Sequence, residues 1–271
     1  MDNPNHRSSH LRATPRAGGL SFVLIGTLIN FLYAPETIRW IPVICLPLAT
    51  VGLIDDFRGL QTFLRYSFQL LTSIFLVIHA GLTIFNWQGV LLVIAITGII
   101  NFTNFMDGLD GLVAGCGVLL MASTSCWALS GAILGFLIWN WSPAKIFMGD
   151  VGSTFIGAVY CGLLITLPSY SESLRFLLIG FPLYGDAFSC VIRRFLNREN
   201  IFQAHRKHLF QRLYQAGWKH QSVATLYISA VGILLFSNII AGFTGLLTAI
   251  SIQFIYALYL DKAVASQFQD T

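Results

Sequence analysis

Long apolar segments separated by short polar ones are the feature that most restricts the fold of this 271-residue chain. Hydrophobic residues make up 55% of the sequence and charged residues only 10%, whereas soluble domains carry about 25% charged residues. So few charges cannot cover a soluble surface, and the chain is predicted to lie in a bilayer. Because a spanning helix needs about 20 apolar residues, the length permits about ten spans. We therefore predict one integral-membrane domain over residues 1–271.

Ten apolar windows are bounded by polar residues, glycine or proline. They cover residues 18–34, 38–53, 67–85, 88–100, 112–129, 130–140, 152–168, 174–192, 223–241 and 243–260. The windows at 88–100 and 130–140 are shorter than a bilayer, so either they extend into the adjoining loops or two windows form one re-entrant element. The runs are continuously apolar, which disfavours a barrel. The predicted fold is an all-α polytopic membrane protein with about ten transmembrane helices.

Basic residues predict the orientation of these spans. With the N-terminus inside the cell, the inside segments are 1–17, 54–66, 101–111, 141–151, 193–222 and 261–271. Every Lys and Arg falls in them except Arg39 and Arg175, as the positive-inside rule requires. The acids Asp55, Asp56, Asp107, Asp110 and Asp150 fall in or beside the same segments. Because an acid at the membrane is costly unless it binds something, we predict a site on loops that face the cytoplasm.

Two motifs place carboxylates at the ends of windows. In Gly52-Leu-Ile-Asp55-Asp56-Phe57, adjacent carboxylates repel each other unless a cation or a donor offsets them; a polar helix terminus is the alternative. In the segment from Asn101 to Asp110, amides and carboxylates recur every three residues, at Asn101, Asn104, Asp107 and Asp110. This spacing keeps them near one helical face or one side of a turn. The second motif therefore predicts a cluster of oxygen ligands.

Two further motifs indicate phosphate. Phe147-Met-Gly-Asp150-Val-Gly-Ser153 begins a span, and the free amides of a helix N-terminus favour anions. A carboxylate beside phosphate points to Mg²⁺, although Asp150 as a plain helix cap is the alternative. His205-Arg206-Lys207-His208 follows Arg193, Arg194 and Arg198, and such cations bind phosphate oxygens or, alternatively, anionic lipid heads.

Several other polar residues carry weaker signals. Asp2-x-Pro4-x-x-Arg7-x-x-His10 adds cations near the first window, and Asp186 is a weaker intramembrane candidate. His6, His79 and His220 belong to no pattern, and we predict no catalytic role for them. Together the motifs predict phosphoryl transfer from a diphosphate to a lipid with Mg²⁺ as cofactor. The alternative is a transporter or flippase. The placement of the acids on one side and the lack of an inverted repeat in the sequence argue against it.

In this order the motifs resemble the polyprenyl-phosphate N-acetylhexosamine-1-phosphate transferase superfamily, from Asp2 to about Trp218. The resemblance implies a bacterial inner-membrane enzyme that transfers a sugar-1-phosphate from a UDP-sugar to undecaprenyl phosphate and releases UMP. Its partners are these two substrates and the bilayer, with no nucleic acid, and a homodimer is left open. The His-Arg-Lys-His segment resembles the O-antigen initiating branch, with UDP-N-acetylglucosamine or its 6-deoxy relatives as candidate donors.

The resemblance also implies roles for particular residues. Asp150 matches the Mg²⁺ ligand, and Asn104 matches a second ligand of some members. Asp55, Asp56 and Asp150 form the catalytic set; the substrate-binding set is Asn104, Asp107, Asp110, Phe147, His205, Arg206 and His208. We expect Asp55 and Asp56 to organise metal and lipid phosphate rather than act as a base, because a phosphate monoester has a second pKa of about 6. Relatives usually have a spanning helix before the Asp-x-Pro motif, so we expect that helix to be missing here.

Overall fold

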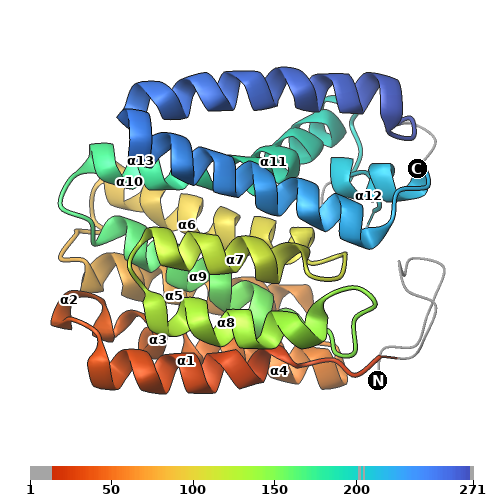
Figure 1. Ribbon diagram of the computed structural model, residues 1–271. Coiled ribbons are helices and arrows are strands. Elements are labelled where there is room, and N and C mark those ends of the chain that lie inside the picture. Colours follow the sequence, from red (N-terminus) through yellow and green to blue (C-terminus); the bar gives the residue numbers. More distant parts are fainter. Residues whose placement is uncertain (1–13, 201–202, 204, 269–271) are drawn as a thin grey trace.

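The computed structural model describes residues 14–200, 203 and 205–268, and the regular structure among them is helical. The helices are α1 (Gly19–Tyr33), α2 (Glu36–Arg39), α3 (Ile41–Ile44), α4 (Leu46–Arg58), α5 (Thr62–His79), α6 (Trp87–Met106), α7 (Leu112–Ser123), α8 (Trp127–Asn140), α9 (Asp150–Ile165), α10 (Tyr170–Ile179), α11 (Phe181–Leu196), α12 (Leu209–Gln215), α13 (His220–Tyr259) and the π-helix η1 (Leu260–Val264). Most of them run along one direction (Figure 1). The all-α prediction is confirmed for the described part of the chain.

Helix α9 forms the centre of the bundle (Figure 1). Its residues from Val151 to Leu164 are all buried, and it packs against α1, α4 and α6. Glycine allows a close contact here, since a Cβ at Gly52 of α4 would lie 2.7 Å from the Asp150 carbonyl. The last turn of α4 therefore lies directly beside the first turn of α9.

Spans can be assigned by length and composition. Among the described residues, Glu36–Arg58, Trp87–Met106 and His220–Val264 are long and apolar enough to cross a membrane, and the bent pair α10–α11 would be a fourth. The apolar helices α1, α7, α8 and α9 are shorter. The polytopic prediction is thus supported, whereas the count of about ten spans stays a prediction.

Several predicted boundaries differ from the observed ones. The short window at 88–100 is part of the 20-residue α6. It therefore extends into the adjoining segment, which was one of the two predicted alternatives. Asn101 and Asn104 therefore lie on α6, and Asp55 and Asp56 lie on the last turn of α4. These four residues belong to helices beside the predicted loops rather than to the loops themselves. The helix continues through Asn101 because its side chain finds partners within the bundle, donating to Gln69 Oε1 at 2.6 Å.

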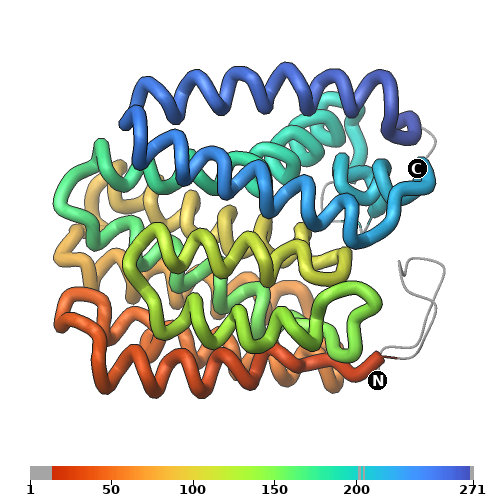
Figure 2. Tube along the Cα trace, viewed as in Figure 1, coloured from red at the N-terminus to blue at the C-terminus, as the bar shows by residue number. Residues whose placement is uncertain are grey.

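The chain reverses inside α13, at Gly242. This residue has φ 60° and ψ −148°, a conformation open mainly to glycine. Figure 2 shows the two halves running antiparallel at one side of the bundle. They match the windows predicted at 223–241 and 243–260. Large apolar side chains on both halves are exposed, among them Ile240 and Ile255, as expected of a surface that faces lipid.

Candidate functional site

The predicted acids gather at one end of the bundle. The ends of α4 and α6 and the start of α9 meet there, on the side where the two ends of the described chain lie (Figure 1). Arg39 and Arg175, the two exceptions to the predicted charge distribution, lie on α2 and α10 at the opposite end. The structure therefore confirms that the acids share one end.

Arg65, on the first turn of α5, lies between two of these acids. Its guanidinium group contacts Asp55 Oδ2 at 3.1 Å and Asp150 Oδ2 at 2.7 Å. Asn104 Nδ2 donates to Asp150 Oδ1 at 2.9 Å and to Ser153 Oγ at 3.0 Å, and Asn104 Oδ1 accepts from Arg65 at 3.5 Å. Four helices thus bring two carboxylates, an amide and a guanidinium together.

Asp56 holds the start of α9. Its two carboxylate oxygens accept from the backbone amides of Asp150 at 3.0 Å and Val151 at 3.2 Å. Gly149 precedes these amides with φ 76°, and a Cβ there would collide with the Asp56 carboxylate. The free amides at this helix N-terminus, which we predicted to bind phosphate, are therefore occupied by Asp56. Asp56 orients Asp150 through its backbone.

Asp107 and Asp110 lie beyond the end of α6, in the turn before α7. Burial raises the pKa of Asp107 to about 8, and the charges of Asp150, Asp56 and Asp110 act in the same direction. Burial also opposes ionisation of Asp110, but its contacts with His220 Nδ1 (3.2 Å) and the Ala144 amide (3.1 Å) lower the pKa of that carboxyl below its usual value. Asp110 thus ties this turn to α13 and to the 141–149 loop.

His205 and His208 line a cavity of about 310 Å³ together with Arg65, Asn104 and Gln211. Burial and the charge of Arg194 lower the pKa of His208 to about 4; burial and the neighbouring His208 lower the pKa of His205 to about 3. Both rings are therefore neutral near pH 7 and able to exchange hydrogen bonds with a ligand. The cavity joins the histidine segment to the acid cluster.

Cys190 lies next to the two histidines. Its thiol and one nitrogen of each ring lie within 4.8 Å of one another, a grouping that the isolated cysteines of the sequence did not indicate. The Lys207 amide already donates to His205 Nδ1 at 3.2 Å, which leaves the proton of a neutral ring on Nε2. A soft metal would have to displace that arrangement, so we assign the two rings to the cavity.

The remaining predicted residues support the backbone near the site. The Phe147 carbonyl accepts from the Gly18 amide at 2.9 Å, and the Arg206 carbonyl accepts from Gln215 at 3.1 Å. Asp186 accepts from the amides of Leu209 and Phe210 and from the Tyr227 hydroxyl, so it fixes the start of α12. Asp2, Arg7 and His10 lie outside the described residues.

The oxygens around Arg65 fit the predicted magnesium ion. Asp55, Asp150 and Asn104 each direct an oxygen to one guanidinium group, within 3.5 Å. Carboxylate and amide oxygens are the protein ligands that Mg²⁺ takes, and a cationic group is already held by this set. The geometry is therefore compatible with Asp150 and Asn104 as metal ligands, and Asp55 directs an oxygen to the same guanidinium group.

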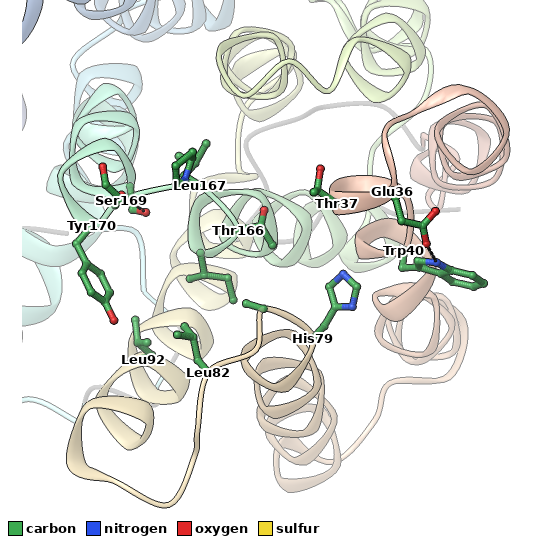
Figure 3. Close-up of a pocket in the computed structure, with 14 residues that line it drawn as sticks. Glu36, Thr37, Trp40, His79, Leu82, Leu92, Thr166, Leu167, Ser169 and Tyr170 are labelled. Carbon is green, nitrogen blue, oxygen red and sulfur yellow. Dashed lines mark hydrogen bonds between the residues drawn. The ribbon is translucent and has the colours of Figure 1, made fainter.

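A larger cavity, of about 590 Å³, lies at the opposite end of the bundle (Figure 3). It is lined by residues such as Glu36, Trp40, His79, Thr166 and Tyr170. Glu36 accepts from Trp40 Nε1 and pairs with Arg39. No residue that we predicted for the site lines this cavity, and His79, for which we predicted no catalytic role, lies here.

Sequence reasoning missed two residues at the site. Arg65 counted only as a basic residue of an inside segment, and His220 was assigned to no pattern. The signal for Arg65 was its position on the first turn of the helix that follows the Asp55-Asp56 pair. Nothing local marked His220, since its partner Asp110 lies 110 residues earlier.

Comparison with known proteins identifies the family of this chain. Residues 39–168 match the sequence profile described as glycosyl transferase family 4. A probable undecaprenyl-phosphate N-acetylglucosaminyl 1-phosphate transferase of Bacillus subtilis is 31% identical over 84% of this chain and 74% of its own length. The undecaprenyl-phosphate alpha-N-acetylglucosaminyl 1-phosphate transferase of Thermotoga maritima is 32% identical over 78% and 73%. A decaprenyl-phosphate N-acetylglucosaminephosphotransferase of Mycobacterium tuberculosis is 28% identical over 86% and 73%. The chain therefore belongs to glycosyl transferase family 4, within the superfamily of polyprenyl-phosphate N-acetylhexosamine-1-phosphate transferases.

Proposed function

We propose that this protein transfers N-acetylhexosamine 1-phosphate from a UDP-sugar to undecaprenyl phosphate at the cytoplasmic face of a bacterial inner membrane, with release of UMP. The observation that carries the proposal is the convergence of Asp55, Asp150, Asn104 and Arg65 beside a cavity lined by His205 and His208. The similarity to transferases that act on polyprenyl phosphates supports the same reaction.

In the proposed reaction an oxygen of the lipid phosphate attacks the β-phosphorus of the donor. The bond from this phosphorus to the bridging oxygen breaks, and UMP leaves with the electron pair. Mg²⁺, held by Asp150 and Asn104 with Asp55, would neutralise charge on the phosphates. Because the lipid phosphate is partly dianionic near neutral pH, positioning and charge neutralisation contribute more than proton removal.

The other site residues position these groups. Arg65 supplies a planar fork that can leave the carboxylates for phosphate oxygens. Asp56 has both oxygens on the amides of α9, which suits a residue that orients Asp150 and does not suit a general base. His205 and His208, with neutral rings, are placed to hydrogen-bond donor hydroxyl or phosphate groups.

For the donor sugar we propose N-acetylglucosamine. The relatives named above act on this sugar, and its 6-deoxy analogues remain alternatives through the His-Arg-Lys-His segment. Initiation of a cell-surface polysaccharide, such as O-antigen, would follow from that donor. The transporter alternative is disfavoured because the described acids of the site lie at one end of the bundle rather than at mid-depth.

The proposal is tested by UMP release from the purified full chain in detergent or nanodiscs. We expect release only when UDP-N-acetylglucosamine, undecaprenyl phosphate and Mg²⁺ are all present, and loss on addition of EDTA. UDP-N-acetylfucosamine, UDP-N-acetylquinovosamine and UDP-N-acetylmuramoyl pentapeptide serve as competing donors. No UMP with any donor, together with lipid translocation in proteoliposomes, would establish the transporter instead.

A further inference from the structure

The C-terminal segment Leu260–Phe268, here called the C-terminal arm, lies against the helix that follows the two histidines. Asp261 of the arm accepts two hydrogen bonds from Arg193 of α11, at 2.9 and 2.7 Å. It also pairs with the guanidinium group of Arg212 on α12. One carboxylate thus joins α11 to α12 through a bidentate contact, the strongest type of charge-assisted hydrogen bond.

Arg212 is fixed on every side by the arm. It is 3% exposed, its Nε donates to the Ser266 carbonyl at 2.6 Å and its Nη2 donates to the Asp261 carbonyl at 3.1 Å. In return, the Ser266 amide donates to the Arg212 carbonyl at 3.3 Å. A buried charge is costly unless it is paired and hydrogen-bonded, so these bonds hold α12 against the arm.

Phe268 of the arm contacts three cations near the histidine segment. Lys207 Nζ lies 5.3 Å from its ring centroid, and the guanidinium carbons of Arg193 and Arg212 lie at 5.5 and 5.6 Å. Three cations against one aromatic ring are within the range of cation–π attraction. Lys207 directly precedes His208, and Arg212 lies one turn after it, so both flanks of His208 are attached to the arm.

We propose that the C-terminal arm is a positioning element for the donor: Asp261 and Phe268 hold His205 and His208 at the cavity from outside it. Neither Asp261 nor Phe268 lines that cavity, so they act through Arg193, Lys207 and Arg212. For its kinetic consequence the proposal rests on the proposed transferase function. The proposal predicts a selective effect: loss of the arm contacts weakens binding of the donor but not binding of the lipid acceptor.

The test compares variants of the full-length protein. Asp261→Asn removes the charge at nearly constant shape, and Phe268→Leu removes the aromatic face at similar volume. We expect each to raise the KM for UDP-N-acetylglucosamine about tenfold, with kcat and the KM for undecaprenyl phosphate within about twofold. Phe268→Trp retains a cation–π face and should restore the donor KM. Lys262→Gln is the matched control, since Lys262 is an exposed charge on the same arm.

Hydrogen exchange supplies a measurement that does not depend on activity. Amides of α12 should exchange about tenfold faster in Asp261→Asn and Phe268→Leu, and at the wild-type rate in Lys262→Gln. Unchanged exchange overturns the proposal, as does faster exchange with an unchanged donor KM, or a lower kcat at an unchanged donor KM. If the wild type releases no UMP, the proposed function fails. The proposal for the arm is then tested by hydrogen exchange and by calorimetric measurement of UDP-sugar binding. If the wild type does not bind the UDP-sugar, the proposal for the arm is overturned as well.

Discussion

The two ends of the helix bundle hold cavities that differ in size and in chemistry. The larger one, of about 590 Å³, has separate polar groups such as Glu36 and His79 at its wall (Figure 3). The smaller one, of about 310 Å³, adjoins a cluster of acids and cations that repel or attract one another across a few ångströms. Cavity volume alone would select the first end, whereas the cost of gathering buried charges selects the second.

The strongest test of this difference is Asp150→Asn, at the smaller cavity. Asp150 contacts both Arg65 and Asn104 and is a proposed metal ligand. Loss of its charge should lower kcat by about 10²- to 10³-fold, and the apparent affinity for Mg²⁺ should fall in the same UMP-release assay. Glu172→Gln, on α10 at the opposite end, is the matched control. Activity retained in Asp150→Asn would remove this carboxylate from the reaction.

Arg65 is expected to have the next largest effect. Arg65→Gln should lower kcat/KM about 100-fold, because two carboxylates lose their shared cation and the phosphates lose a donor. Arg65→Lys keeps the charge but not the planar fork, so a loss of about tenfold is expected. Equal losses in the two variants would show that the fork, not the charge, is what matters. Little loss in either would leave Arg65 as a partner of the acids only.

The unfolding temperature of an Asp107 variant tests whether the acid cluster reduces stability. Its pKa of about 8 in the folded chain exceeds the usual 3.8, so folding favours the protonated form. Its contribution to stability is therefore complete below pH 3.8 and is lost as the pH rises toward about 8. In EDTA and without donor, Asp107→Asn should raise the unfolding temperature by several degrees near pH 8 and by less near pH 5. A gain that does not depend on pH would contradict the raised pKa.

The sequence predicted which residues meet at the site better than how they meet. Asp55, Asn104 and Asp150 come together as expected, because the helix ends that carry them lie at one end of the bundle, as the positions of the basic residues predicted. The rotation of each helix about its axis could not be predicted. In the structure Asn101 donates to Gln69, whereas Asn104 donates to Asp150. The close approach of α4 to α9 depends on Gly52, and the partnership of Arg65 depends on that approach. Such details follow from packing between distant segments rather than from local pattern.

Substitutions at the larger cavity are expected to have the smallest effect on activity. They also test whether only one end of the bundle takes part in the reaction. Glu36→Gln and His79→Gln should change kcat/KM by less than about twofold, because Glu36 is a largely exposed side chain whose pair with Arg39 contributes little. Neither residue lies near the acids that would hold Mg²⁺, so UMP release with saturating and with limiting donor should match the wild type. A tenfold loss in either variant, with an unchanged unfolding temperature, would mean that the opposite end takes part in the reaction and that clustered charge is not a sufficient guide to the site.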